Sequence, residues 1–238
     1  MKEADGAADG WPEPRPGARH PEPAHAMVKR VLHRGIVSGT FPAGTRLVQA
    51  RIAEELGVST HPVRDALREL AAGGFVQVDA RGAAVVHELS RIELEDLYEI
   101  RKLLEPVATA RAAKYASRDS MLAAAGLMEA MESETDGPQW AEYNSRFHSV
   151  IEEAGNNARL VEVLRNLREL SALYVTHSIL SEPDRVRRGN AEHKQILQAI
   201  ITRDPEAAAD AMLRHLDGTI RTLLNVHEVG GPRRRIPG

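Results

Sequence analysis

Cysteine is missing from the 238-residue sequence, aromatic residues make up only 4% of it, and its formal net charge is -3. Without cysteine, disulfide bonds and thiolate metal or redox sites are excluded. No apolar run reaches the roughly 18 residues that a membrane-spanning helix needs. The first residues also hold no apolar core of a signal peptide. We therefore expect a cytoplasmic protein without a membrane partner.

The slightly negative net charge is unevenly distributed along the chain. Residues 25–90 hold 8 Lys and Arg against 6 Asp and Glu, whereas residues 91–228 hold 17 against 23. A mildly basic N-terminal part joined to an acidic C-terminal part predicts two domains with different tasks.

The two ends of the chain differ in composition from its middle. Residues 1–24 are rich in Pro, Gly, Ala and charged side chains, and we predict that they form a disordered tail. Residues 229–238, with Gly-Gly-Pro and three consecutive arginines, are predicted to be a second, flexible tail. Between them we expect one domain at residues 25–89 and an all-α domain at residues 90–228.

Residues 25–89 show the pattern of three helices followed by a hairpin. HAMVKRVLHRGIVSG has apolar residues at helical spacing, and TFPAGTRL is interpreted as an irregular link. QARIAEELG is a short helix stopped by Gly57, and the next helix has Ser59 or Thr60 as its N-cap. FVQVD and AAVVHE surround Ala80-Arg81-Gly82, which predicts a β-hairpin.

This order of helix, tight turn, helix and hairpin is typical of a winged helix-turn-helix, whose second helix enters the major groove of DNA. Hydroxyl and free N–H groups at the start of that helix suit a phosphate, and an arginine one turn later can read guanine. The predicted DNA contacts are Ser59, Thr60, His61, Arg64, Arg68, Arg81 and Gly82. The alternative is that Arg64 and Arg68 form only the solvated face of an amphipathic helix.

The segment FPAGTRLVQARIAEELGVSTHPVRDALRELAAGGFVQVDARGAAVV resembles the DNA-binding domain of GntR-family transcriptional regulators. The motifs that carry the resemblance are F-P-x-G-x-x-L, I-A-x-x-L-G-V-S, P-V-R-[ED]-A-L-R-x-L, a G-F-V strand and an R-G-A-x-V wing. Many members have Arg then Thr where this chain has Thr60 and His61. That difference concerns the operator sequence rather than DNA binding itself.

From Ser90 onward the pattern is helical, with about six helices. Ser90 and Glu93 form a capping-box signature, and Pro106 is expected to kink the first helix. The later helix starts are marked by Ser117 with Asp119, Gly137-Pro138, Asn156-Asn157, Ser181 with Pro183, and Asp204-Pro205. The predicted fold is mainly α, with an N-terminal winged helix-turn-helix and a C-terminal all-α effector bundle.

Arg101 lies within the apolar face of the first bundle helix, at helical spacing from Leu97 and Leu104. A buried guanidinium needs an anionic partner. Two partners fit: an internal carboxylate such as that of Glu105, or the carboxylate or phosphate of a small ligand held by a bidentate pair. The spacing favours neither.

Three histidines, His148, His193 and His215, point into the bundle from different predicted helices. Asn144 lies four residues before His148 and adds an oxygen atom on the same helix face. A single inward histidine is usually a hydrogen-bonded core residue. Three of them with an amide oxygen fit a divalent metal ion, zinc first and nickel or manganese as alternatives. Neutral ligands leave the ion its charge, which attracts an anionic ligand.

Residues 91–225 are similar to the FCD effector domain of the FadR-like branch of the GntR family. The matching segments are LYEIRKLLEPVATARAA, NSRFHSVIEEAGN, AEHKQILQAI and DAMLRHL. In metal-binding members an Asp precedes the first histidine by four, which places the ligands at Asn144, His148, His193 and His215. The resemblance implies a homodimer on a palindromic operator, and an organic-acid or sugar-acid effector near the metal and Arg101.

Together these features predict a transcriptional regulator, a repressor in most such families, that binds double-stranded DNA and a small carboxylate-bearing effector. We do not expect an enzyme. Two other functions stay open: a metallohydrolase built on the bundle, and an architectural DNA binder with a structural metal. Against the hydrolase, spacing predicts that Glu152, Glu153 and Glu192 point away from the histidines, which leaves no general base beside them.

Overall fold

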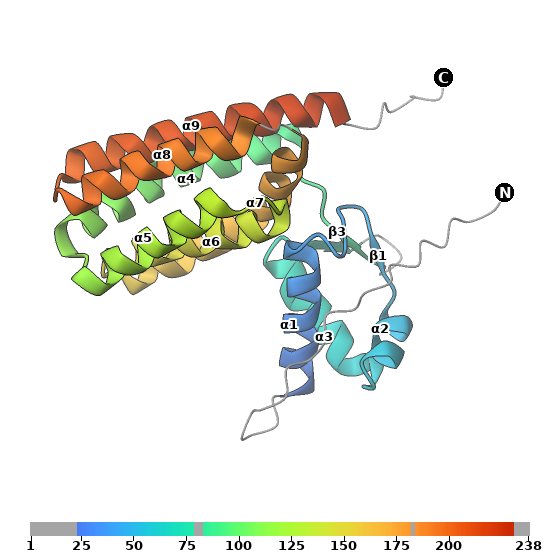
Figure 1. Ribbon diagram of the computed structural model, residues 1–238. Helices are drawn as coiled ribbons and strands as arrows, with labels where there is room; N and C mark the ends of the chain where they lie inside the picture. The colour runs from blue at the N-terminus through green and yellow to red at the C-terminus, as the bar shows by residue number, and fades with distance from the viewer. Residues whose placement is uncertain (1–22, 79–82, 182–183, 231–238) are drawn as a thin grey trace. The chain divides into compact units, whose positions relative to one another are not determined.

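A computed structural model of the chain describes residues 23–78, 83–181 and 184–230 (Figure 1). The chain forms two compact units, one ending at Glu88 and the other beginning at Leu89. Within the described residues, none of the helices combines the length and apolar character that a bilayer span requires.

The two predicted tails fall almost entirely outside the described residues, so their disorder stays a prediction. The exceptions are residues 23–24, at the start of the first helix, and residues 229–230, which end the last helix.

Three helices and a three-stranded antiparallel sheet make up the described part of the first unit. The strand order is β1-β3-β2. The elements are α1 (Ala24–Val37), β1 (Arg46–Leu47), α2 (Gln49–Glu55), α3 (Thr60–Ala72), β2 (Val76–Val78) and β3 (Ala84–Val86).

Strand β1 lies in the segment TFPAGTRL, where the prediction of an irregular link was wrong. Leu47 pairs with Ala84 of β3 and is buried, whereas Arg46 is exposed. A strand of two residues is too short for its alternation to show in the sequence.

Apolar packing of α1 on α3 gives the first unit its core. Val28, Leu32, Ile36, Val63 and Ala66 are completely buried, and burying one large aliphatic side chain contributes about 1.5–3 kcal/mol. Because this packing uses one face of α3, the opposite face is directed to solvent.

Six helices form the described part of the second unit, as the sequence predicts. They are α4 (Arg91–Tyr115), α5 (Arg118–Ser133), α6 (Gly137–Ala154), α7 (Ala158–Ser181), α8 (Asp184–Ile201) and α9 (Pro205–Gly230). Figure 1 shows α8 and α9 side by side with α4, and α5 and α6 beside each other. Helix α4 continues through Pro106.

The predicted capping box at the start of α4 is confirmed. Glu93 N donates to Ser90 Oγ at 3.2 Å, and Ser90 N donates to Glu93 Oε2 at 2.8 Å. The helices enclose one apolar core, in which the largest fully buried side chains include Leu94, Tyr98, Met131, Phe147, Ile196 and Met212.

Candidate metal and effector site and DNA-binding helix

His148 on α6, His193 on α8 and His215 on α9 meet in the interior of the helical unit. Their ring centroids lie 4.6 to 5.1 Å apart. One ligand atom from each ring lies within 4.8 Å of the others, and none of the three residues is more than 5% exposed. The three residues therefore lie close enough together to share one ion.

Three of the six ring nitrogens in this cluster lack the hydrogen bonds that core histidines usually have. Both nitrogens of His193 and Nδ1 of His148 are buried without a hydrogen-bond partner among the described residues. Leaving a buried polar atom unsatisfied costs about 1–3 kcal/mol. A divalent cation would satisfy such nitrogens, so the donor set fits a metal ion.

Burial keeps the three rings neutral, which is the form that binds metal. Desolvation lowers the pKa of His148 and of His193 well below the ordinary value, and the charge of His215 lowers both further. Desolvation also lowers the pKa of His215, although the neighbouring Glu192 opposes this effect.

Glu192 on α8 contacts the cluster directly. Its Oε2 lies 2.8 Å from His215 Nδ1 and 3.4 Å from Nη1 of the buried Arg185. A carboxylate that accepts Nδ1–H leaves Nε2 of the same ring free for a metal. The prediction that Glu192 points away from the histidines was therefore wrong.

A glycine makes room for this carboxylate. A Cβ atom added at Gly218 on α9 would lie 2.9 Å from Oε1 of Glu192. Any larger residue there would displace the Glu192 side chain, so Gly218 helps to position it.

Asn144, the proposed oxygen ligand, lies one helical turn before His148 on α6 and is half-buried. It is on the same helix as one of the histidines, as the sequence predicts. Its role as a ligand stays a prediction.

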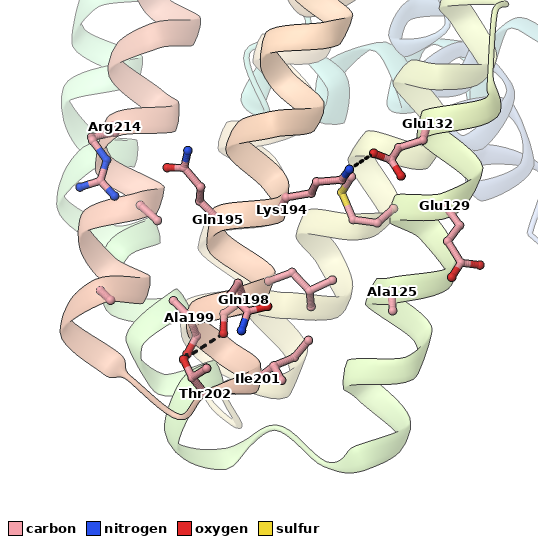
Figure 2. Close-up of a pocket in the computed structure, with 14 residues that line it drawn as sticks. Ala125, Glu129, Glu132, Lys194, Gln195, Gln198, Ala199, Ile201, Thr202 and Arg214 are labelled. Atoms are coloured by element: carbon pink, nitrogen blue, oxygen red, sulfur yellow. Dashed lines mark hydrogen bonds and ion pairs between the residues drawn. The ribbon is translucent and has the colours of Figure 1, made fainter.

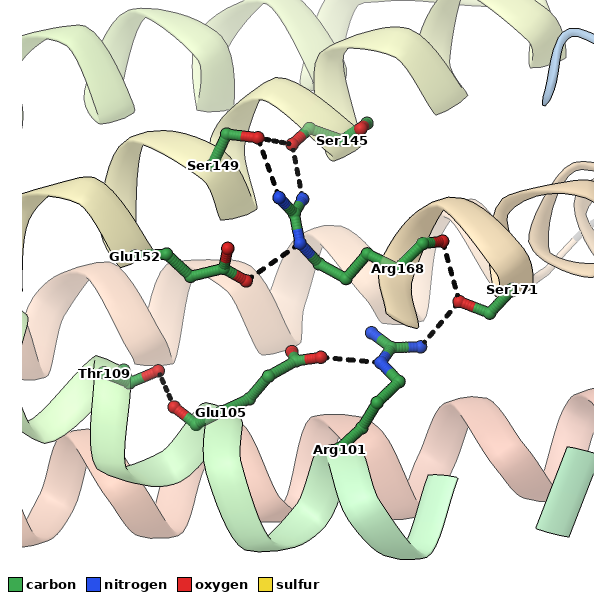
Figure 3. Close-up of polar contacts among 8 residues, drawn as sticks. All are labelled: Arg101, Glu105, Thr109, Ser145, Ser149, Glu152, Arg168 and Ser171. Atoms are coloured by element: carbon green, nitrogen blue, oxygen red, sulfur yellow. Dashed lines mark hydrogen bonds and ion pairs between the residues drawn. The ribbon is translucent and has the colours of Figure 1, made fainter. Parts of the chain in front are cut away.

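Arg101 is buried and has an internal carboxylate partner (Figure 3). Its Nε donates to Glu105 Oε1 at 2.6 Å, and its Nη1 donates to Ser171 Oγ at 3.0 Å. The guanidinium also lies 4.5 Å from the ring centroid of Tyr98. Of the two partners that the sequence allows, Glu105 is the one in contact with Arg101.

A second buried arginine, Arg168 on α7, stands beside this pair. Its Nε lies 2.8 Å from Glu152 Oε1, its Nη1 donates to the carbonyl oxygen of Ser145, and its Nη2 donates to Ser149 Oγ. Figure 3 shows both arginine–glutamate pairs in one region of the bundle. Glu152 is thus an inward residue, contrary to the prediction, whereas Glu153 is exposed.

The charges of these arginine–glutamate pairs influence the pKa of the histidine cluster. The charges of Arg168 and Arg101 contribute to the lowered pKa of His148, after burial and the other histidines. Burial raises the pKa of Glu152 to about 7, because it outweighs the opposing effect of Arg168. Glu152 therefore exchanges its proton near neutral pH.

A surface groove of about 750 Å³ lies elsewhere in the unit (Figure 2). Helices α5, α8 and α9 line it, and Lys194 and Glu132 form an ion pair across it. Lys194 faces this groove, whereas its chain neighbour His193 is completely buried. The groove and the histidine cluster therefore lie on different faces of α8.

Five of the seven predicted DNA-contacting residues lie at the start and on the outer face of α3. Gly57, with φ of +63°, ends α2, and Ser59 is the N-cap of α3 in an extended conformation. The Ser59 side chain accepts no capping hydrogen bond within the described residues. Its hydroxyl and the N–H groups of the first turn are thus available to a phosphate.

Arg64 and Arg68 are both exposed, together with Thr60 and His61. Asp65 lies 3.0 Å from Nδ1 of His61 and 3.9 Å from Nη1 of Arg68. Exposed pairs of this kind contribute little and are easily exchanged for other partners. Arg81 and Gly82 lie outside the described residues, so their role at the wing stays a prediction.

Comparison with known proteins identifies both units. The FCD domain matches residues 96–218, and the bacterial regulatory proteins of the gntR family match residues 24–86. Among solved structures, Escherichia coli McbR/YncC has a TM-score of 0.76 at 24% identity over 87% of this chain and 99% of that chain, which shows a common fold.

Two relatives have 31% sequence identity to this chain. A protein of Paenarthrobacter nicotinovorans, described as a probable D-xylose utilization operon transcriptional repressor, matches over 80% of this chain and 84% of its own length. The Uxu operon transcriptional regulator of Escherichia coli (strain K12) matches over 82% of this chain and 84% of its own length. Both are regulators rather than enzymes, which removes the metallohydrolase alternative. The chain belongs to the GntR family of bacterial transcriptional regulators, with an N-terminal winged helix-turn-helix and a C-terminal FCD domain.

Proposed function

We propose that this protein is a homodimeric repressor whose operator affinity changes when a small hydroxylated carboxylic acid binds near a metal ion in the FCD domain. The observation that carries the proposal is the cluster of three buried histidines, contributed by three helices, with ring nitrogens that lack partners among the described residues. The repressor role is supported by the similarity to the Paenarthrobacter nicotinovorans protein, which is described as a probable D-xylose utilization operon transcriptional repressor.

The residues that would hold the metal are His148, His193 and His215, with Asn144 as an additional oxygen ligand. When bound, the ion supplies a positive charge that attracts an acid group. Glu192 fixes the orientation and tautomer of His215 through Nδ1, so its role is to position a ligand.

Unsatisfied acceptors next to the cluster favour an effector that carries hydroxyl groups. Oε2 of Glu105 and Oε2 of Glu152 are buried without a hydrogen-bond partner among the described residues. Carboxyl oxygens of this kind can accept hydrogen bonds from hydroxyl groups. A sugar acid has both an acid group for the metal and hydroxyl donors for these glutamates.

Regulation requires that the acid bind one arrangement of the dimer more tightly than the other, because equal affinity shifts no equilibrium. On the DNA side, Ser59, Thr60, His61, Arg64 and Arg68 would contact one half-site from the start and the outer face of α3. Arg81 and Gly82 would add contacts from the wing.

The test measures binding of the zinc-loaded protein to a duplex selected from a random library, by fluorescence anisotropy at fixed salt. D-Gluconate and D-galactonate are the hydroxylated probes, and hexanoate is the control with the same chain length and no hydroxyl group. We expect a sugar acid to lower operator affinity at least about tenfold, which corresponds to about 1.4 kcal/mol, and hexanoate to have no effect.

A matched variant separates sensing from DNA binding. His193→Ala should retain operator binding but lose the response to the sugar acid. Equal responses to gluconate and hexanoate would contradict the proposal that Glu105 and Glu152 recognise hydroxyl groups of the effector. Metal binding without any acid response would instead favour an architectural DNA binder with a structural metal.

A further inference from the structure

Positive charge exceeds negative charge among the buried side chains of the helical unit. Within its described residues, the buried charged side chains are those of Arg101, Arg168, Arg185, Glu105 and Glu152. Burial also raises the pKa of Glu152 to about 7, so this carboxyl group is only partly ionised at neutral pH. A bound divalent ion would add further positive charge, because the three histidine rings are neutral. The interior therefore favours a negatively charged ligand.

Arg185, on α8, is the buried arginine whose charge is least well compensated. It is 5% exposed, and its carboxylate partner among the described residues is Glu192, whose Oε2 lies 3.4 Å from Arg185 Nη1. The other two buried arginines lie 2.6 Å and 2.8 Å from carboxylates that are at most 2% exposed, whereas the Glu192 side chain is 26% exposed. A long contact with a partly solvated carboxylate compensates a buried guanidinium poorly.

Arg185 also shares this carboxylate with a histidine of the cluster. The oxygen of Glu192 that faces Arg185 lies 2.8 Å from Nδ1 of His215. Because the contact with the histidine is the shorter one, another anion can replace Glu192 at Arg185 while Glu192 keeps its bond to the ring. Nη2 of Arg185 donates to Thr219 Oγ1 at 2.7 Å, so Thr219 holds the guanidinium in place.

The charge of Arg185 acts on two rings of the histidine cluster. Burial is the main cause of the lowered pKa of His193 and of His215, and Arg185 lowers both further. For the third ring, that of His148, the contributing arginines come from α7 and α4 instead. Guanidinium groups from different helices therefore stand beside different rings of the cluster.

We propose that Arg185 forms a second anion-binding subsite, and that the effector is a sugar acid with two anionic groups. One acid group is attracted by the metal ion. The second group accepts hydrogen bonds from the Arg185 guanidinium, whose Nη1 exchanges the long contact with Glu192 for this one. The second group is a carboxylate or a phosphate, since the guanidinium fork matches both. The inference rests on the proposed function and specifies the charge of its effector.

The test is isothermal titration calorimetry of the zinc-loaded, full-length protein with three sugar acids of the same chain length. D-Gluconate has one acid group, D-glucarate has a second carboxylate at the other end, and 6-phospho-D-gluconate has a phosphate there. We expect glucarate or phosphogluconate to bind at least about tenfold more tightly than gluconate, because hydrogen bonds to a charged group contribute about this factor. The tighter of the two identifies the second anionic group.

A variant of Arg185 links this preference to the subsite. Arg185→Gln should lower the affinity for the preferred acid at least about tenfold and the affinity for gluconate much less. The matched control is Arg187→Gln on the same helix, at an arginine that is 81% exposed, and it should keep the preference. The zinc content of each variant is measured as well, so that a loss of metal is not mistaken for a loss of the subsite.

Equal affinities of the wild-type protein for the three acids would overturn the inference. It is also overturned if Arg185→Gln keeps the wild-type preference, or if it loses gluconate and the preferred acid equally, as a purely structural arginine would. If Arg185→Gln does not fold, Arg185→Lys takes its place, because it keeps the charge but lacks the fork and should reduce the preference. Failure of the proposed function gives a different result, because then none of the acids binds.

Discussion

Oε2 of Glu192 lies 2.8 Å from Nδ1 of His215, and the two residues come from adjacent helices of the FCD domain. The carboxylate is only partly buried, whereas the histidine ring is almost completely buried. Desolvation alone would raise the pKa of Glu192, but the hydrogen bond and charge of His215 outweigh it, so the pKa is lowered. Glu192 is therefore ionised near neutral pH and accepts the Nδ1–H of His215.

Glu192→Gln should weaken metal binding about 10-fold to 100-fold, because an amide holds the His215 ring less firmly in the required tautomer. Gly218→Ala should also weaken metal binding, although it removes no charge, because its Cβ would displace the Glu192 carboxylate. Competition with a chromophoric zinc chelator measures both affinities. Glu129→Gln, at an exposed position on α5, is the control, and an equal loss in that variant would contradict the positioning role.

Arg64→Ala should weaken binding to the selected operator by about 1–3 kcal/mol if Arg64 reads a base. It should also reduce the preference of the protein for the selected duplex over random DNA. Anisotropy titrations at one salt concentration give both numbers. Arg34→Ala removes the same charge from an exposed position of α1 and should have a much smaller effect; equal losses would assign Arg64 a purely electrostatic role.

Glu105→Gln should lower the free energy of unfolding of the FCD domain by about 3–5 kcal/mol, because it leaves the buried Arg101 without its anion. Replacing both residues with methionine should recover most of this loss, since no buried charge remains. Urea unfolding monitored by the fluorescence of the buried Trp140 reports on this domain. A loss below about 1 kcal/mol in Glu105→Gln would mean that another group compensates Arg101.

Glu152 should make the FCD domain less stable as pH rises. Its pKa is about 7 in the folded protein against an ordinary value of 4.5. Between these values the folded state holds a proton that the unfolded state has lost, so the free energy of unfolding falls as pH increases. Over this pH range the free energy of unfolding should fall by on the order of 3 kcal/mol in total.

The difference between wild type and Glu152→Gln isolates this effect from other titrating groups. Arg168, Glu105 and Arg101 are the charged groups that act on Glu152 from α7 and α4. Urea unfolding of the metal-free proteins at pH 5 and pH 7.5 should show a steeper loss of stability in the wild type. If the free energy of unfolding depended on pH in the same way in the wild type and in Glu152→Gln, this would contradict the raised pKa of Glu152.

The sequence predicts the helices well because their starts have strong local signals, such as the capping box of Ser90 and Glu93. The sequence also predicts that His148, His193 and His215 face the interior of the bundle, because each lies on the apolar side of its helix. Strand β1 has no local signal, because two residues become a strand only through pairing with β3.

The burial of two arginines was not predicted from the sequence, although their helical spacing indicates it. Arg168 lies four residues after the buried Leu164, and Arg185 lies eight residues before His193, on the inner faces of their helices. The spacing that singled out Arg101 would have found both. Glu192 is different, because its contact with His215 depends on how α8 packs against α9, which no single helix reveals.

The most direct measurement of the central claim is the metal content of wild-type protein purified from cells without added ions. The three-histidine site predicts about one equivalent of divalent metal per chain, and a His193→Ala variant that has lost it. Less than about a tenth of an equivalent, not restored by zinc, nickel or manganese, would identify the histidines as core residues and contradict the account.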